Sequence, residues 1–186
     1  MARTCVEAEH SRNYNALYQA IRNSCMKEHK HFSSGEALAS SAAKTAMDID
    51  ASMILVLSET GRTARMVAKF RPGRTIVCLT TNSTVTRQCS GVLTGVHAYL
   101  VDSLEDTNYL INEVITEAIK INVLKEGDKV VTVCGTNHGH GHNDMIRVEY
   151  AHMNYWDEEG EVKAPRGKGA LEADTHGHLA AGFHFG

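Results

Sequence analysis

The residues most able to bind a ligand lie in one short polar loop. They are, in chain order, Ser58, Glu59, Thr60, Gly61, Arg62 and Thr63. Before them, Met53–Leu57 is a continuous apolar run, which is typical of a strand covered on both faces. After them, apolar residues recur with helical spacing as far as Phe70, and Pro72 ends the pattern. The loop therefore lies between the C-terminal end of a predicted strand and the N-terminus of a predicted helix.

This position favours the binding of an anion. Backbone N–H groups in a first helical turn lack partners inside the helix, and the helix dipole attracts negative charge there. The hydroxyls of the loop can donate further hydrogen bonds, and Arg62 can add a charge-assisted one. Glu59 opposes this chemistry, because a carboxylate repels a phosphate unless it points away. The loop predicts a phosphate or carboxylate site; a well-capped helix start without a ligand uses the same groups and remains the alternative.

Two more polar loops follow predicted strands, at 80–83 and 135–142. If the sheet is parallel, all three loops lie along one edge, where ligands bind in such folds. The last loop contains enough glycine to fold over a ligand. Its candidate binding residues are Thr136, Asn137, His138, Gly139, His140 and Gly141.

The histidines of this last loop raise a separate possibility. His138, His140 and His142 alternate with glycines, so in an extended loop they would share one face and could hold a divalent metal. We favour a solvent-exposed loop and predict no metal site, because no neighbouring cysteine supports one and the glycines leave the loop unorganised. We also predict no catalytic residue, because the chain has no phosphate-binding lysine loop, no G-x-S-x-G and no paired acids at a strand end.

The elements that position these loops alternate along the chain. Ser33 and Glu36 form a capping-box pattern that starts a helix ending near Asp48. Alternating apolar strands and helices predict an α/β three-layer sandwich, with a mostly parallel five-stranded sheet and helices on both faces. The last strand should be antiparallel, since only a loop precedes it. We predict strands at 53–57, 75–80, 96–101, 129–134 and 145–150, and helices at 33–48, 60–70, 83–89 and from about 103–106 onwards.

Length and composition set further bounds. The 186 residues suffice for one domain with a sizeable core plus a tail. We divide them into a helical lead-in at 1–24, an α/β domain at 25–151, and a flexible or extended tail at 152–186. A net charge of −3 gives no reason to expect nucleic acid or a membrane as partner, and no apolar run approaches the ~20 residues of a membrane span. Five cysteines without C-x-x-C spacing, and an N-terminus without a secretory signal, fit a reduced, cytoplasmic protein.

The segment Leu57–Pro72 resembles the C-terminal domain of pyruvate kinase. That family has a strand, a hydroxyl-rich S/T-x-S/T-G-x-[ST]-A loop, and a helix ending in [KR]-[YF]-R-P at this place, and the match is long and specific. Segments 36–46, 126–131 and 143–148 are similar to the same family, and the resemblance extends over about residues 3–150. Residues 3–9 are similar to the end of the catalytic barrel that precedes this domain.

The resemblance implies a regulatory and assembly role. Pyruvate kinases transfer a phosphoryl group from phosphoenolpyruvate to ADP with Mg²⁺ and usually K⁺, mostly as tetramers. Their reaction takes place in the barrel, most of which this chain lacks, so we expect no cofactor and no activity in the isolated chain. In many members an effector phosphate binds the loop that matches Ser58–Thr63, and its other end lies under the loop that matches 136–142.

Two departures weaken the case for fructose 1,6-bisphosphate in particular. Glu59 stands where responsive members often have a basic or neutral residue, and Thr136 stands where many animal enzymes have tryptophan. A monophosphate or free phosphate remains open as the anionic effector. Two other functions remain open as well: a stand-alone small-molecule enzyme or binding protein on the same α/β domain, and a tetramerisation module without a ligand.

Overall fold

The central sheet has five strands in the order β3-β2-β1-β4-β5. The computed structural model describes residues 12–104, 106–135, 145–152, 155–156 and 162–163. Three parallel pairings join the first four strands, and β4 and β5 pair antiparallel, which confirms the predicted fold class. The strands are β1 (Met53–Leu57), β2 (Thr75–Thr80), β3 (Val96–Leu100), β4 (Lys129–Cys134) and β5 (Met145–Tyr150).

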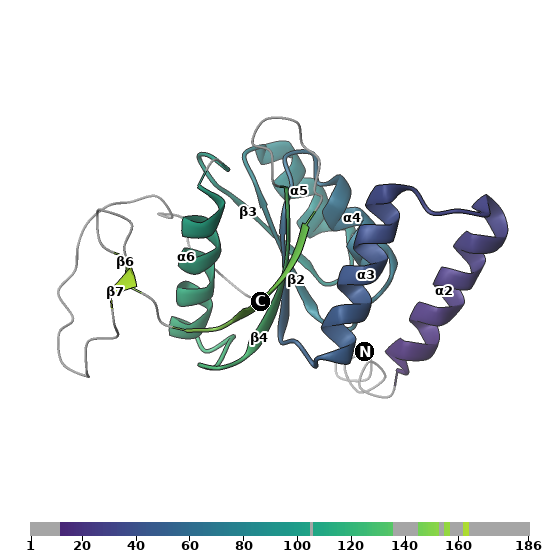
Figure 1. The fold of residues 1–186 in the computed structure, drawn as a ribbon. Coiled ribbons are helices and arrows are strands. Elements are labelled where there is room, and N and C mark those ends of the chain that lie inside the picture. The colour runs from purple at the N-terminus through teal and green to yellow at the C-terminus, as the bar shows by residue number, and fades with distance from the viewer. Residues whose placement is uncertain (1–11, 105, 136–144, 153–154, 157–161, 164–186) are drawn as a thin grey trace, which may run out of the picture.

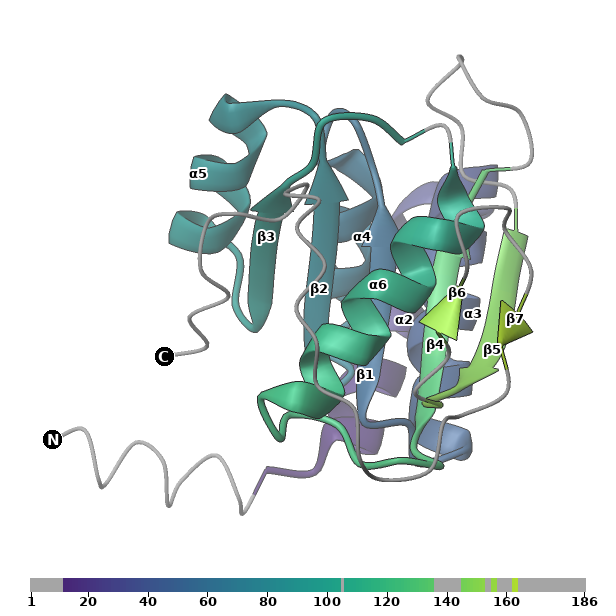
Figure 2. The same ribbon diagram turned by 90° about the vertical axis from the view of Figure 1, so that its left-hand side faces the viewer.

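Helices cover both faces of this sheet (Figure 1, and from another side in Figure 2). On one face, α3, α4 and α5 pack against alternate strand residues such as Ile54 and Val56. On the other face, α6 packs against the intervening residues, including Leu55 and Leu57. α2 lies outside α3. The helices are α2 (Tyr14–His29), α3 (Ser34–Asp48), α4 (Arg62–Lys69), α5 (Ser83–Val92) and α6 (Thr107–Lys120).

Strand burial follows from position in the sheet. Every residue of β1 is buried, since β1 has a strand on each side and helices above and below. β5 is an edge strand, and its Val148 and Tyr150 are exposed. The central position of β1 fixes the loop that follows it, which is the loop with the candidate ligand-binding residues.

The predicted strands agree closely with the observed ones, whereas several helix boundaries differ. α4 begins at Arg62 rather than near Thr60, because Gly61 has a left-handed φ of 68° and cannot belong to the helix. α5 continues to Val92, past the predicted end at Cys89. α6 begins at Thr107, just after the predicted start at 103–106.

The predicted capping box is present. Ser33 is the N-cap of α3, and its Oγ accepts a hydrogen bond of 3.3 Å from the Glu36 backbone N–H. The Ser33 hydroxyl also donates to the Glu36 carboxylate at 3.3 Å. These contacts give α3 a defined start, from which it runs back across the sheet.

The two ends of the chain are described in part. The helix predicted in the lead-in is seen as α2, which runs past residue 24, while residues 1–11 lie outside the described part. In the predicted tail, β6 (Tyr155–Trp156) and β7 (Val162–Lys163) pair antiparallel; the rest of 153–186 lies outside the described residues. Among the helices described, none has the length and apolar character needed to span a membrane.

Candidate functional site

The β1–α4 loop is held firmly at the C-terminal edge of the sheet. Ser58 is 8% exposed, and its backbone N–H donates to the Leu79 carbonyl of β2 at 2.9 Å. Gly61 is buried and acts as the N-cap of α4. The loop therefore leaves a buried strand and enters the helix within four residues, with the first turn of α4 directly beyond it.

Gly61 is required here for two reasons. Its φ of 68° lies in the left-handed region, which side chains with a Cβ rarely adopt. In addition, a Cβ at this position would stand 2.7 Å from Val85 Cγ1 and 2.9 Å from Cys89 Sγ. The start of α4 thus packs tightly against α5, and this close approach sets where the first turn of α4 lies.

A hydroxyl of the neighbouring strand joins the first two predicted loops. Thr80, at the end of β2, is fully buried; its Oγ1 donates to the Glu59 carbonyl at 3.0 Å and accepts from the Asn82 N–H at 3.2 Å. The two loops therefore meet at one edge of the sheet, as the parallel arrangement predicted. The sequence indicated the position of Thr80 but not this bridging role, because a buried threonine at a strand end is equally typical of plain packing.

The first turn of α4 offers donors without acceptors. Its N-cap makes no side-chain hydrogen bond, and no acidic residue lies in that turn. The Arg62 N–H makes a long contact of 3.4 Å with Thr60 Oγ1, and the Arg65 N–H bonds to the Gly61 carbonyl at 3.0 Å. Within the described residues, the N–H groups of Thr63 and Ala64 have no hydrogen-bond acceptor, so the positive end of the helix is uncompensated.

The charged side chains of the loop belong to exposed residues. Glu59 and Arg62 are both exposed, and within the described part of the chain neither forms an ion pair. Within the described residues no hydrogen bond joins the Glu59 carboxylate to the first turn of α4, and the exposed Arg62 is accessible to a ligand there. By contrast, Asn82 caps α5 by accepting from the Thr84 N–H at 2.9 Å, so the second loop satisfies its own helix end.

The third predicted loop lies outside the described residues. It contains Thr136, Asn137, His138, Gly139, His140 and Gly141, and also His142. The strand before it, β4, pairs in parallel with β1, so it ends at the same edge as the first loop. Among the described residues there is no cluster of three or more histidine, cysteine or acidic side chains that could hold a metal ion.

A pair of thiols beneath the loop was not anticipated. Cys78 of β2 and Cys89 of α5 are buried and unoxidised, and Cys89 lies near enough to Cys78 to affect its pKa. Burial, with a smaller contribution from the adjacent Cys89, raises the pKa of Cys78 to about 12. Burial also raises the pKa of Cys89. The two residues are eleven positions apart in different elements, so no spacing pattern could have indicated their contact.

The family of this domain is shown by comparison with known proteins. Residues 36–149 match the family model described as "Pyruvate kinase, alpha/beta domain", which spans more than half of the chain. The described loops belong to an α/β domain with a mostly parallel sheet. The chain is a member of the pyruvate kinase family, through the C-terminal domain of that family.

Curated and solved relatives agree with this membership. The chain is 37% identical to a pyruvate kinase of Eimeria tenella, over 73% of this chain and 25% of that protein. It is 37% identical to a pyruvate kinase of Dictyostelium discoideum, over 80% of this chain and 29% of that protein. A pyruvate kinase structure from Cryptosporidium parvum superposes with a TM-score of 0.72 at 30% identity, over 80% of this chain and 28% of that one. The chain thus spans between a quarter and a third of these relatives.

Proposed function

We propose that this chain is the regulatory and assembly domain of a pyruvate kinase and binds an anionic effector at the first turn of α4. The observation that carries this proposal is the pair of unpartnered N–H groups at Thr63 and Ala64, with no acidic side chain in that turn. A phosphate there would accept both main-chain hydrogen bonds and interact favourably with the helix dipole. Arg62 would supply a charge-assisted bond from the exposed side.

The effector we favour is a phosphate or a sugar monophosphate. Ser58, Thr60 and Thr63 supply hydroxyls, and Gly61 lets the main chain approach the anion closely. The exposed Glu59 disfavours a second phosphate nearby. We further propose that residues 136–141 cover the outer end of the ligand, since β4 ends beside β1.

The activity of the whole enzyme is phosphoryl transfer from phosphoenolpyruvate to ADP, in the cytoplasm, by a catalytic barrel that this domain would accompany. Mg²⁺ and K⁺ would bind in that barrel. An effector here could change that activity only by binding two quaternary states with different affinity. Helix faces in a homo-tetramer would provide such states.

Calorimetry of the full chain with inorganic phosphate and sugar phosphates tests the proposed site. Arg62→Ala should weaken phosphate binding about tenfold, the effect of losing one charge-assisted hydrogen bond. Arg87→Ala, an exposed arginine on α5, is the matched control and should leave binding unchanged. Glu59→Lys should improve the binding of a sugar bisphosphate. Unchanged affinity in Arg62→Ala would show that the anion binds elsewhere.

An assay for ATP formation separates the other functions from this one. The isolated chain should form no ATP from phosphoenolpyruvate and ADP. Turnover of any bound substrate would instead favour a stand-alone enzyme. Self-association in light scattering, with no shift in melting temperature for any phosphate compound, would favour a module that serves assembly alone.

A further inference from the structure

A groove of about 420 Å³ separates α2 from α3, a volume within the usual range of small-molecule sites. It has a tyrosine, four other polar uncharged side chains and two cations in its lining, and no acidic residue lines it. α2 and α3 form a helical hairpin at the side of the domain (Figure 1). The residues that matter for binding are Tyr18, Gln19 and Arg22 from α2, and Ser40, Ser41 and Lys44 from α3.

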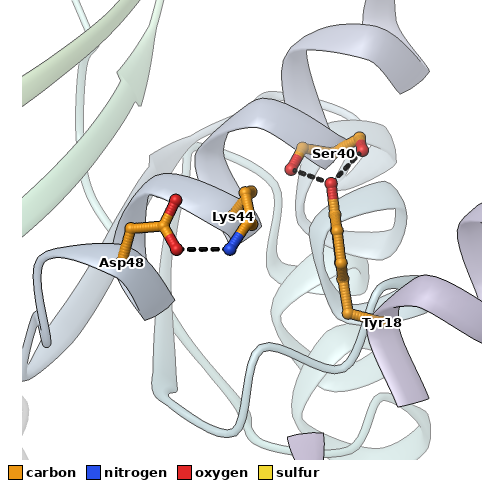
Figure 3. Close-up of polar contacts among 4 residues, drawn as sticks. All are labelled: Tyr18, Ser40, Lys44 and Asp48. Carbon is orange, nitrogen blue, oxygen red and sulfur yellow. Dashed lines mark hydrogen bonds and ion pairs between the residues drawn. The ribbon is translucent and has the colours of Figure 1, made fainter. Parts of the chain in front are cut away.

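The floor of the groove is a fixed polar contact between the two helices. Tyr18 and Ser40 are each 3% exposed. The Tyr18 Oη lies 2.8 Å from Ser40 Oγ and donates to the Ser40 carbonyl at 3.2 Å (Figure 3). The ring of Tyr18 also packs against Phe70, with their centroids 5.9 Å apart. A ligand would therefore meet a preorganised surface rather than having to order it.

The two cations are held at the groove without being fully neutralised. The Arg22 guanidinium lies 5.5 Å from the ring centroid of Phe32, a cation–π contact, and it has no carboxylate partner among the described residues. Lys44 forms an ion pair with Asp48, which is exposed (Figure 3). An ammonium group has three donors, so Lys44 can bind a second anion beside Asp48.

The positions of these cations on an antiparallel hairpin set the shape of the ligand. Arg22 lies one turn after Tyr18 on α2, and Lys44 lies one turn after Ser40 on α3. Because Tyr18 and Ser40 touch and the helices run in opposite directions, the two cations lie on opposite sides of that contact. Two turns correspond to roughly 11 Å along the helix axes, before the long side chains reach inward.

We propose that this groove binds a small organic dianion, with one anionic group on Arg22 and the other on Lys44. Carboxylate and phosphate groups both satisfy this chemistry, and a short carbon chain between them would lie over the hydroxyl floor. Ser41 is exposed along the same wall and supplies a further hydroxyl. This site is separate from the first turn of α4 and does not depend on the function proposed for that turn.

Calorimetry of the full chain with straight-chain dicarboxylates, from malonate to adipate, tests the groove. Saturable binding should reach a maximum at an intermediate chain length and exceed that of acetate and inorganic phosphate. Arg22→Gln and Lys44→Gln should each weaken binding of the preferred dicarboxylate about tenfold. Both side chains are solvent-accessible and each makes one weak contact, so these variants should lower the melting temperature only slightly.

Two control variants locate the binding. Arg87→Gln on α5 and Arg62→Ala on α4 should leave dicarboxylate affinity unchanged. The proposal is overturned if no dicarboxylate binds saturably, if acetate binds as well as the dicarboxylates, or if affinity falls in Arg62→Ala instead of in Arg22→Gln. Loss of phosphate binding in Arg62→Ala with dicarboxylate binding intact would support two independent sites.

Discussion

The hydroxyl of Thr80 donates a hydrogen bond of 3.0 Å to the carbonyl of Glu59. This contact fixes the main chain of the β1–α4 loop from the neighbouring strand. The Glu59 carbonyl is thereby held towards β2, while residue Glu59 as a whole remains exposed. The candidate anion site is consequently built by two strands and not by the loop alone.

Replacing Thr80 with valine should weaken this support. Valine has nearly the same shape but leaves the Glu59 carbonyl and the Asn82 N–H without their partner, at a cost of about 1–3 kcal/mol in the free energy of unfolding. Urea denaturation measures that loss, and Thr80→Ser, which keeps the hydroxyl, should recover most of it. Equal stability of the serine and valine variants would mean that the hydrogen bonds contribute little.

A substitution of Gly61 by alanine should be among the most damaging single changes in the loop. The left-handed φ and the contacts with Val85 and Cys89 together predict a loss of about 2–4 kcal/mol. Gly91 provides a matched control, since a Cβ there meets nothing within 4 Å in a helical position. Gly91→Ala should instead raise stability by about 0.5–1 kcal/mol. Thermal melts measure both variants. Equal shifts in melting temperature for Gly61→Ala and Gly91→Ala would refute the argument.

The ion pair between Glu36 and Lys69 should make stability depend on pH. Lys69 Nζ donates to the Glu36 carboxylate at 2.9 Å, and this hydrogen bond holds the pKa of Glu36 below its usual value. Stability from the pair is therefore present above pH 4.5 and is lost as the pH falls through the lowered pKa. Because both groups are partly exposed, Glu36→Gln should cost only about 0.5 kcal/mol at pH 7. A deficit that persists unchanged at pH 3 would contradict this.

The buried thiol of Cys78 should reduce stability in alkali. Its pKa is raised from 9.0 to about 12, chiefly by burial, so between those values the unfolded chain loses the proton and the folded chain keeps it. The free energy of unfolding should then fall by about 1.4 kcal/mol per pH unit in that window and be unaffected below it. Cys78→Ala removes the group, so the stability gap between wild type and variant should shrink as the pH rises. A constant gap from pH 8 to 11 would show that the thiol does not titrate in this way.

The sheet was predictable from the sequence because its signal is local. Met53–Leu57 is continuously apolar and Lys129–Cys134 is mostly so, and the alternation of such runs with helices allows few topologies. The antiparallel last strand followed from the prediction that only a loop, and no helix, precedes it. The start of α4 was harder to predict than the strands. The sequence around Gly61 fits a helix capped by a loop hydroxyl as well as one that begins only after a left-handed glycine.

Contacts between distant residues could not be predicted. Tyr18 and Ser40 are 22 positions apart, and their contact depends on how α2 leans on α3. The same holds for Cys78 with Cys89, and for Thr80 with Glu59. The candidate anion loop was identifiable because strand, glycine and helix start adjoin in the chain, whereas its support from β2 and the groove beside α3 result from tertiary packing.

Nuclear magnetic resonance of the amide groups during titration with inorganic phosphate tests the central proposal most directly. We predict saturable shifts of the backbone N–H signals of Thr63 and Ala64, larger than those of Thr84 in the self-capped α5. If these two signals stay unchanged at phosphate concentrations that saturate binding elsewhere, the first turn of α4 is not an anion site.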